Sequence, residues 1–120
     1  MRVAVVDDDD TARMLISDFL KDRGHDVVAV PDPRKLESVE SYEAIIMDVM
    51  IGHDRYAGID YVLEQYTNGR IRDEERVVFI SNFGRDSAEI RSRLQKVGTY
   101  IWLDKPIDLP ELDRILSEAN

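Results

Sequence analysis

The sequence has 120 residues, of which 43% are hydrophobic, so we expect one domain with a single core over residues 1–120. The formal net charge of −9, from 16 basic and 25 acidic residues, argues against direct binding to nucleic acid or to anionic lipid. The absence of cysteine excludes disulfides and thiolate metal sites, and the absence of a leader or a long apolar run predicts a cytoplasmic protein.

Four consecutive carboxylates follow the first apolar run of the chain. The run, Val3 to Val6, does not alternate between apolar and polar residues, so it predicts a strand buried on both faces. Asp7 to Asp10 come directly after it, at the strand's carboxyl end, where open α/β sheets bind ligands. A helix start explains one or two of these acids. Because adjacent carboxylates repel one another, the remaining acids suggest a site for a hard cation such as Mg²⁺.

Apolar runs and apolar periodicity predict five strands and five helices in alternation. The strands are expected over residues 3–6, 26–30, 44–49, 77–81 and 100–103. Apolar residues at helical spacing predict helices around residues 12–20, 36–39, 59–66, 90–97 and 112–119. The second helix has the weakest pattern, because only Leu36 and Val39 mark its apolar face.

Helix-start residues agree with this assignment. Asp32 is expected to cap the second helix, and Asp86 or Ser87 is expected to cap the fourth. Asp108 and Glu111 have the spacing of a capping box at the start of the last helix.

Alternating strands and helices predict a parallel sheet with helices on both faces. Right-handed crossovers leave few strand orders, one of which is the flavodoxin-like order 2-1-3-4-5 of a three-layer sandwich. In that order Asp7 and Asp8 lie beside Asp48, at the ends of the first and third strands. Ser81 and Lys105, which end the fourth and fifth strands, complete the same rim.

This rim combines the groups needed for phosphoryl chemistry. Two carboxylates can hold Mg²⁺ together with water and a phosphate oxygen, and a third can attack phosphorus to form an acyl phosphate. A metal and a lysine neutralise the phosphoryl oxygens.

Asp48 interrupts an apolar strand, where an unpaired charge is costly, which favours a functional role. Taken alone, Lys105 and Ser81 would be a surface lysine and a turn hydroxyl. His25 and His53 are expected to be ordinary surface histidines, since no ligand pair has metal-site spacing.

Four segments resemble the motifs of a response-regulator receiver domain of two-component signalling, in the same order and on the same strand ends. They are VVDD, AIIMDV, FIS and LDKP. The sequence resembles this family over essentially its whole length. The resemblance implies that Asp48 accepts a phosphoryl group from a sensor histidine kinase or phosphotransfer protein. It implies a downstream protein target or output domain, a monomer or phosphorylation-dependent dimer, and a signalling phospho-acceptor rather than an enzyme acting on other substrates.

The resemblance also implies a Mg²⁺ site. Its direct ligands would be Asp8, Asp48 and the Met50 carbonyl, with Asp7 acting through water. The loop from Asp48 to Gly58 is longer than the usual family spacing and lacks the usual proline, which leaves its path and any contact with the metal open.

Four further features follow from the resemblance. Ser81 matches the switch hydroxyl, and Trp102 falls where the family has its rotating aromatic residue, with Tyr100 on the same face of the strand. Lys105 matches the phosphate-contacting lysine, and the Lys105–Pro106 peptide bond is expected to be cis.

Two other functions remain open at this point. Asp7, Asp9 and Thr11 also form the D-x-D-x-T motif of haloacid-dehalogenase-type phosphatases, in which Asp7 would be the nucleophile and Lys105 the lysine. Three features count against a phosphatase of this type. The chain is short for that fold, no acidic pair follows Lys105, and Asp48 would have no role. The other alternative is a receiver-like interaction module that is never phosphorylated.

Overall fold

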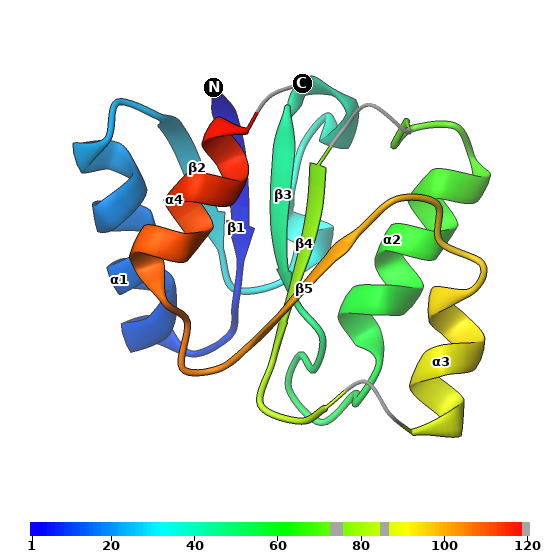
Figure 1. Ribbon diagram of the computed structural model, residues 1–120. Coiled ribbons are helices and arrows are strands. Elements are labelled where there is room, and N and C mark those ends of the chain that lie inside the picture. The colour runs from blue at the N-terminus through cyan, green and yellow to red at the C-terminus, as the bar shows by residue number, and fades with distance from the viewer. Residues whose placement is uncertain (73–75, 85–86, 119–120) are drawn as a thin grey trace.

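The protein is a three-layer α/β sandwich around a parallel sheet (Figure 1). The computed structural model describes residues 1–72, 76–84 and 87–118. Its strands are β1 (Arg2–Val6), β2 (Asp26–Val30), β3 (Ala44–Asp48), β4 (Arg76–Ser81) and β5 (Ile101–Asp104). They pair in the order β2-β1-β3-β4-β5, which confirms the predicted flavodoxin-like topology.

Helices cover both faces of the sheet, as the alternating pattern predicts. They are α1 (Asp10–Asp22), α2 (Ala57–Thr67), α3 (Ala88–Leu94) and α4 (Leu109–Ser117). Helices α1 and α4 pack on one face, and α2 and α3 pack on the other (Figure 1). Side chains alternate along each strand, so β1 sends Val3 and Val5 into one core and Ala4 and Val6 into the other. Within the described ranges, no helix is long and apolar enough to span a membrane.

The prediction of five helices is wrong, because the crossover between β2 and β3 forms two 3₁₀ turns instead of an α-helix. The turns are Pro33–Lys35 and Val39–Ser41, which leaves four α-helices in the described part of the chain. Asp32 does cap the first turn and accepts a hydrogen bond from the Arg34 backbone. Leu36 then returns to extended backbone, and Ser38 takes a left-handed conformation with φ 52°. Two apolar positions cannot overcome these breaks.

The predicted caps of the later helices are largely confirmed. Ser87 caps α3 by accepting a hydrogen bond from the Ile90 backbone, whereas Asp86 lies outside the described residues. Asp108 caps α4 by accepting from the Glu111 backbone. The reciprocal half of the capping box does not form, because the Glu111 carboxylate accepts hydrogen bonds from Arg114 instead.

The prediction that His25 is an ordinary surface histidine is also wrong. Only 12% of its side chain is exposed, and its Nε2 lies 3.5 Å from an Asp113 carboxylate oxygen. Its Nδ1 lies 3.4 Å from the Met1 amino group. The loop between α1 and β2 meets α4 here and creates this environment, which the local sequence around His25 does not reveal. His53 is exposed, as predicted.

Gly58 allows α2 to start directly against the end of β3. Its backbone N–H donates to the Val49 carbonyl at 2.9 Å. A Cβ atom at this position would lie 1.9 Å from the Asp48 carbonyl oxygen and 2.9 Å from a side-chain atom of Met47. The absence of a side chain at Gly58 therefore sets how closely α2 approaches the rim of the sheet.

We expect Gly58→Ala to destabilise the protein by about 2–4 kcal/mol, because the added methyl group meets backbone that cannot move away. Helix propensity alone would predict that this change increases stability by about 1 kcal/mol. The sign of the measured stability change therefore distinguishes a steric clash from a propensity effect. Urea unfolding measures the difference. Gly84→Ala is the matched control, since a Cβ there meets nothing within 4 Å. Equal stability of both variants would contradict this account.

Candidate functional site

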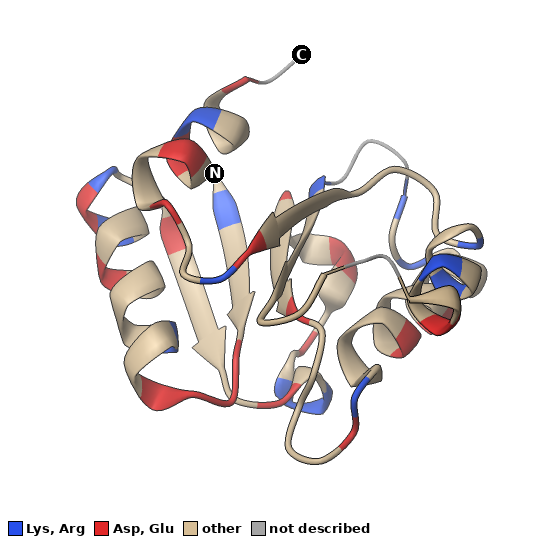
Figure 2. Ribbon diagram, turned by 60° about the horizontal axis from the view of Figure 1, so that its bottom comes forward, with Lys and Arg blue, Asp and Glu red and all other residues tan. Residues whose placement is uncertain are grey.

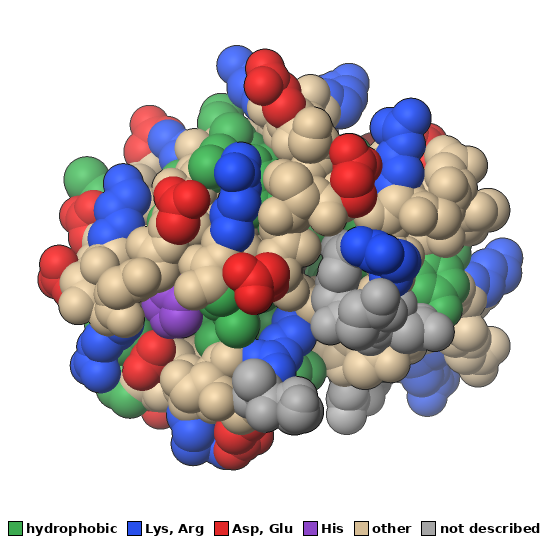
Figure 3. All heavy atoms as spheres, turned by 90° about the horizontal axis from the view of Figure 1, so that it is seen from above, with side chains coloured by type: hydrophobic (Ala, Val, Ile, Leu, Met, Phe, Trp, Pro, Cys, Tyr) green, Lys and Arg blue, Asp and Glu red, His purple; other side chains and the backbone are tan. Residues whose placement is uncertain are grey.

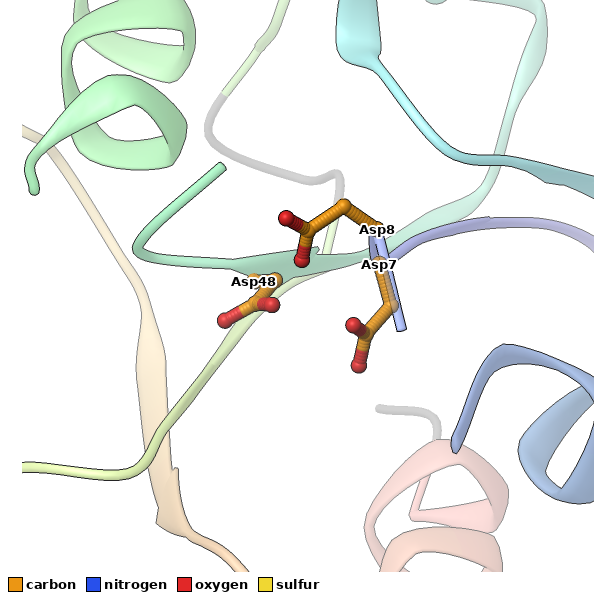
Figure 4. Close-up of side chains that lie close together, drawn as sticks. All are labelled: Asp7, Asp8 and Asp48. Carbon is orange, nitrogen blue, oxygen red and sulfur yellow. The ribbon is translucent and has the colours of Figure 1, made fainter. Parts of the chain in front are cut away.

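The carboxyl ends of β1 and β3 bring three aspartates together. The strands are neighbours, with Val6 opposite Met47, so Asp7 and Asp48 end adjacent strands. One carboxylate oxygen from each of Asp7, Asp8 and Asp48 lies within 4.8 Å of the others (Figure 4). The predicted acidic cluster therefore forms, from two segments that lie far apart in the sequence.

Lys105 links two of these carboxylates. Its Nζ lies 2.9 Å from Asp7 Oδ2 and 3.2 Å from Asp48 Oδ2. Its backbone N–H donates to the Ser81 carbonyl at 2.7 Å, which anchors the loop after β5 to the end of β4. The Lys105–Pro106 bond is cis, as the family resemblance implies. The structure thus places the predicted lysine in contact with the predicted acids.

Burial makes this cluster unusual electrostatically. Asp7 is fully buried and Asp48 is 5% exposed. Burial, together with the negative charge of Asp7, raises the pKa of Asp48 to about 7, although Lys105 opposes the rise. Burial also disfavours the charged form of Lys105, but its hydrogen bonds and proximity to Asp7 and Asp48 outweigh this and raise the pKa of the lysine. One ammonium group therefore does not fully compensate the carboxylates around it.

Asp8 is exposed and is held by the longer loop. Its Oδ2 accepts a hydrogen bond of 2.7 Å from the Gly52 backbone N–H. Ile51 and Asp54 exchange backbone hydrogen bonds across a two-residue turn, and Gly52 occupies the first central position with φ 61°, where hairpin turns favour glycine. The loop thus folds back to the acidic cluster and orients Asp8 through its backbone.

Sequence analysis did not identify two groups that contact the cluster. Arg13 of α1 donates from Nη1 to the Asp7 carbonyl at 2.9 Å, and Gly52 contacts Asp8. The spacing of Asp10 and Arg13 does predict their ion pair within α1. Neither spacing nor composition predicts the contacts with Asp7 and Asp8, because both depend on how separate elements pack.

Ser81 is buried at the end of β4, and its hydroxyl is already hydrogen-bonded. Its Oγ donates to the Phe83 carbonyl at 2.7 Å and accepts from the Phe83 N–H at 3.0 Å. Trp102 lies partly exposed on the neighbouring edge strand β5, opposite Phe79, and its Nε1 donates to Asp104 at 3.1 Å. Its ring centroid lies 6.2 Å from that of Phe79.

Tyr100 packs against the ring of Phe79, as Trp102 does, which agrees with the alternation of the strand. Its ring centroid lies 5.9 Å from that of Phe79. Met50 follows β3 and is partly buried. The proposed metal contact of its carbonyl remains a prediction, as do the switch roles of Ser81 and Trp102.

Charged residues lie at both ends of the sheet (Figure 2 and Figure 3). The acidic stretch Asp7 to Asp10 leads from β1 into α1 at the carboxyl ends of the strands (Figure 2). At the opposite end, acidic and basic side chains are interspersed (Figure 3). A cluster of carboxylates with one lysine thus lies at the topological switch point of the sheet, where open α/β sheets bind ligands.

The sequence comparison identifies the family. A family model described as the response regulator receiver domain matches residues 3–117. The chain therefore belongs to the response-regulator receiver domains, as its motifs indicate. A search of curated proteins finds no match.

Solved structures of receiver domains share the fold. Chemotaxis protein CheY4 of Vibrio cholerae has a TM-score of 0.78 at 23% identity, covering 99% of this chain and 98% of that chain. A CheY-like receiver domain protein of Methanospirillum hungatei has a TM-score of 0.79 at 16% identity, covering 98% and 90%. The BeF3-activated receiver domain of Klebsiella pneumoniae RstA has a TM-score of 0.76 at 21% identity, covering 99% and 97%.

The raised pKa of Asp48 predicts how stability depends on pH in the absence of metal. In the folded protein the Asp48 carboxyl keeps its proton up to about pH 7. In the unfolded chain it releases the proton near pH 3.8, its ordinary pKa. Stability therefore falls as the pH rises between these values, and the penalty is complete above pH 7. Asp48→Asn should be more stable than wild type at about pH 8, by at most about 4 kcal/mol. This advantage should shrink toward about pH 4.

Urea unfolding across this pH range measures the effect. Asp22→Asn, at the exposed end of α1, is the control and should follow wild type throughout. A pH-independent difference between Asp48→Asn and wild type would show that the Asp48 carboxylate does not titrate in this window.

Proposed function

We propose that this receiver domain, spanning residues 1–120, accepts a phosphoryl group on Asp48 in the cytoplasm. The donor is the phosphohistidine of a sensor kinase or phosphotransfer protein, and the product changes binding to a downstream protein or output domain. One observation carries the proposal: Asp48 is a buried carboxylate at a strand end, facing two further carboxylates and a lysine. Such a group is expensive to bury without a function.

The transfer needs little from the protein beyond position and charge. A carboxylate oxygen of Asp48 attacks phosphorus, the bond from phosphorus to the donor imidazole breaks, and an acyl phosphate remains. Lys105, now 3.2 Å from Asp48, offers an ammonium group to the phosphoryl oxygens. The chain acts on its own side chain, so we propose a phospho-acceptor and not an enzyme with a separate substrate.

The residues present fit a Mg²⁺ ion. Three carboxylates offer oxygen ligands close together, and one lysine leaves negative charge uncompensated. Asp8, Asp48 and the Met50 carbonyl would hold the ion directly, and Asp7 would contact it through water. When bound, Mg²⁺ supplies positive charge to the transferring phosphoryl oxygens.

The phosphatase alternative finds no support in the geometry. Its motif needs Asp7 as nucleophile and Asp9 beside it. The Asp9 carboxylate instead caps α1 by accepting hydrogen bonds from the Thr11 and Ala12 backbone. Asp9 therefore serves the helix start, which leaves no second catalytic carboxylate in that motif.

Asp48→Asn should abolish phosphorylation by acetyl phosphate with Mg²⁺, because the amide cannot form an acyl phosphate. Mass spectrometry of the intact protein and of its peptides measures the adduct and maps it. Asp60→Asn, an acidic residue on α2 outside the cluster, should be phosphorylated like wild type. An adduct that persists in Asp48→Asn but disappears in Asp7→Asn would support the phosphatase. If wild type forms no adduct with acetyl phosphate and none with a phosphorylated sensor kinase, the result would support the phosphorylation-independent module.

Beryllofluoride with Mg²⁺, which mimics the phosphoryl group, should change the fluorescence of Trp102, the only tryptophan. A phosphoryl oxygen offers Ser81 an acceptor in place of the Phe83 carbonyl, and Ser81 moving inward would vacate space beside β5. In Ser81→Ala the mimic should still bind, but the emission change should shrink by at least about half.

Ser81→Thr keeps the hydroxyl and should restore the emission change. An identical response in wild type and Ser81→Ala would exclude the hydroxyl as the driver of Trp102.

A further inference from the structure

A groove lies between the 3₁₀ turns of the β2–β3 crossover and helix α2. It consists of two hollows of about 300 and 560 Å³, a size typical of binding sites. Both hollows are lined by Pro33, Arg34, Tyr61 and Glu64, so they form one continuous feature. Neither is lined by the aspartates of the acidic cluster or by Lys105.

The replacement of the expected helix by two short turns shapes this groove. Pro33 and Val39 are buried, and between the two turns Leu36 has extended and Ser38 left-handed backbone. The left-handed conformation of Ser38, at φ 52°, is costly for a residue with a side chain and marks a segment held in an unusual path. Ser38 lines the larger hollow.

The groove carries an excess of negative charge. Its acidic lining residues are Asp32, Glu40, Asp54, Asp60 and Glu64, against two basic ones, Arg34 and Arg70. Two of these acids already have basic partners. Asp32 binds Arg34 through two hydrogen bonds of 3.1 and 2.8 Å, and Asp60 binds Arg93 of α3 at 2.9 Å. Within the described residues, no ion pair is found for Glu40, Asp54 or Glu64, and the acids lining the groove outnumber its two arginines, so the groove attracts cations.

Tyr61 sits at the centre of the groove and is partly buried. Burial raises the pKa of its phenol, and the negative charges of Glu64 and Glu40 add to the rise, while Arg70 opposes it. A neutral aromatic ring among carboxylates is the set of groups that binds ammonium or guanidinium ions. Gln65 also lines the larger hollow, and among the described residues its buried Oε1 finds no hydrogen-bond donor.

We propose that this groove binds a short cationic segment of a partner protein. An apolar residue of the segment would pack against Leu36 and Tyr61, and a neighbouring lysine or arginine would lie between Glu40 and Glu64. The segment competes for none of the groups that hold the phosphoryl group, so the site is additional to the proposed function and does not depend on it.

The test uses the whole protein with Mg²⁺ present, and two peptides as probes. One is acetyl-Ala-Arg-Leu-Arg-Ala-amide, and the other has glutamate in place of both arginines. Amide NMR spectra should show saturable shifts over residues 34–40 and 57–65 with the arginine peptide only, with a Kd below about 1 mM. Glu40→Gln/Glu64→Gln should weaken binding about tenfold.

Glu37→Gln is the matched control, because Glu37 is exposed in the same segment but does not line the groove. It should weaken binding less than about twofold. An equal loss in Glu37→Gln, shifts confined to the acidic cluster, or no shifts with millimolar peptide would each overturn the proposal. Asp48→Asn should bind the peptide like wild type, so failure of phosphorylation and failure of this site are distinguished.

Discussion

The contact of one lysine with two buried carboxylates determines the character of this structure. Lys105 reaches Asp7 and Asp48 from the end of β5, although 98 positions separate it from Asp7. That contact exists only because all strands are parallel, so their carboxyl ends meet at one edge. Without the ammonium group, two buried carboxylates would face each other unscreened. With it, the pKa of Asp48 is still about 7, so the cluster keeps a deficit of positive charge.

The backbone, more than additional cations, organises the rest of the cluster. The Gly52 N–H holds Asp8, and the Asp9 N–H donates to Asp7 at 2.9 Å. Backbone donors orient a carboxylate without cancelling its charge, whereas another lysine or arginine side chain would neutralise it. Gly58 contributes through its missing side chain, because it lets α2 approach the carbonyl of Asp48. The result is an oriented set of oxygens that retains its attraction for a cation.

Sequence reasoning succeeded where one local signal and one topological rule were enough. The apolar runs predicted the strands, and the parallel order then placed Asp48 and Lys105 at a common rim without any knowledge of side-chain contacts. It failed where packing between distant elements decides. The weak periodicity around Leu36 predicted a helix, but the left-handed backbone of Ser38 interrupts it and two short turns form instead. The burial of His25 was missed because its carboxylate partner, Asp113, lies on α4. The contact of Gly52 with Asp8 depends on the turn of a loop, which no periodicity encodes.

The hydroxyl of Ser81 is already hydrogen-bonded, so any movement of this side chain has to break existing hydrogen bonds. Its hydroxyl both donates to and accepts from the backbone of Phe83, and under the proposed function a phosphoryl oxygen would replace the Phe83 carbonyl as its acceptor. The net free-energy change of such an exchange is small, since the lost bond offsets most of the gained one. Under the proposed function, the bias would then come largely from the charge of the phosphoryl group. Phe79 contacts both Tyr100 and Trp102, so packing changes at the end of β4 have a direct route to the exposed edge of the sheet.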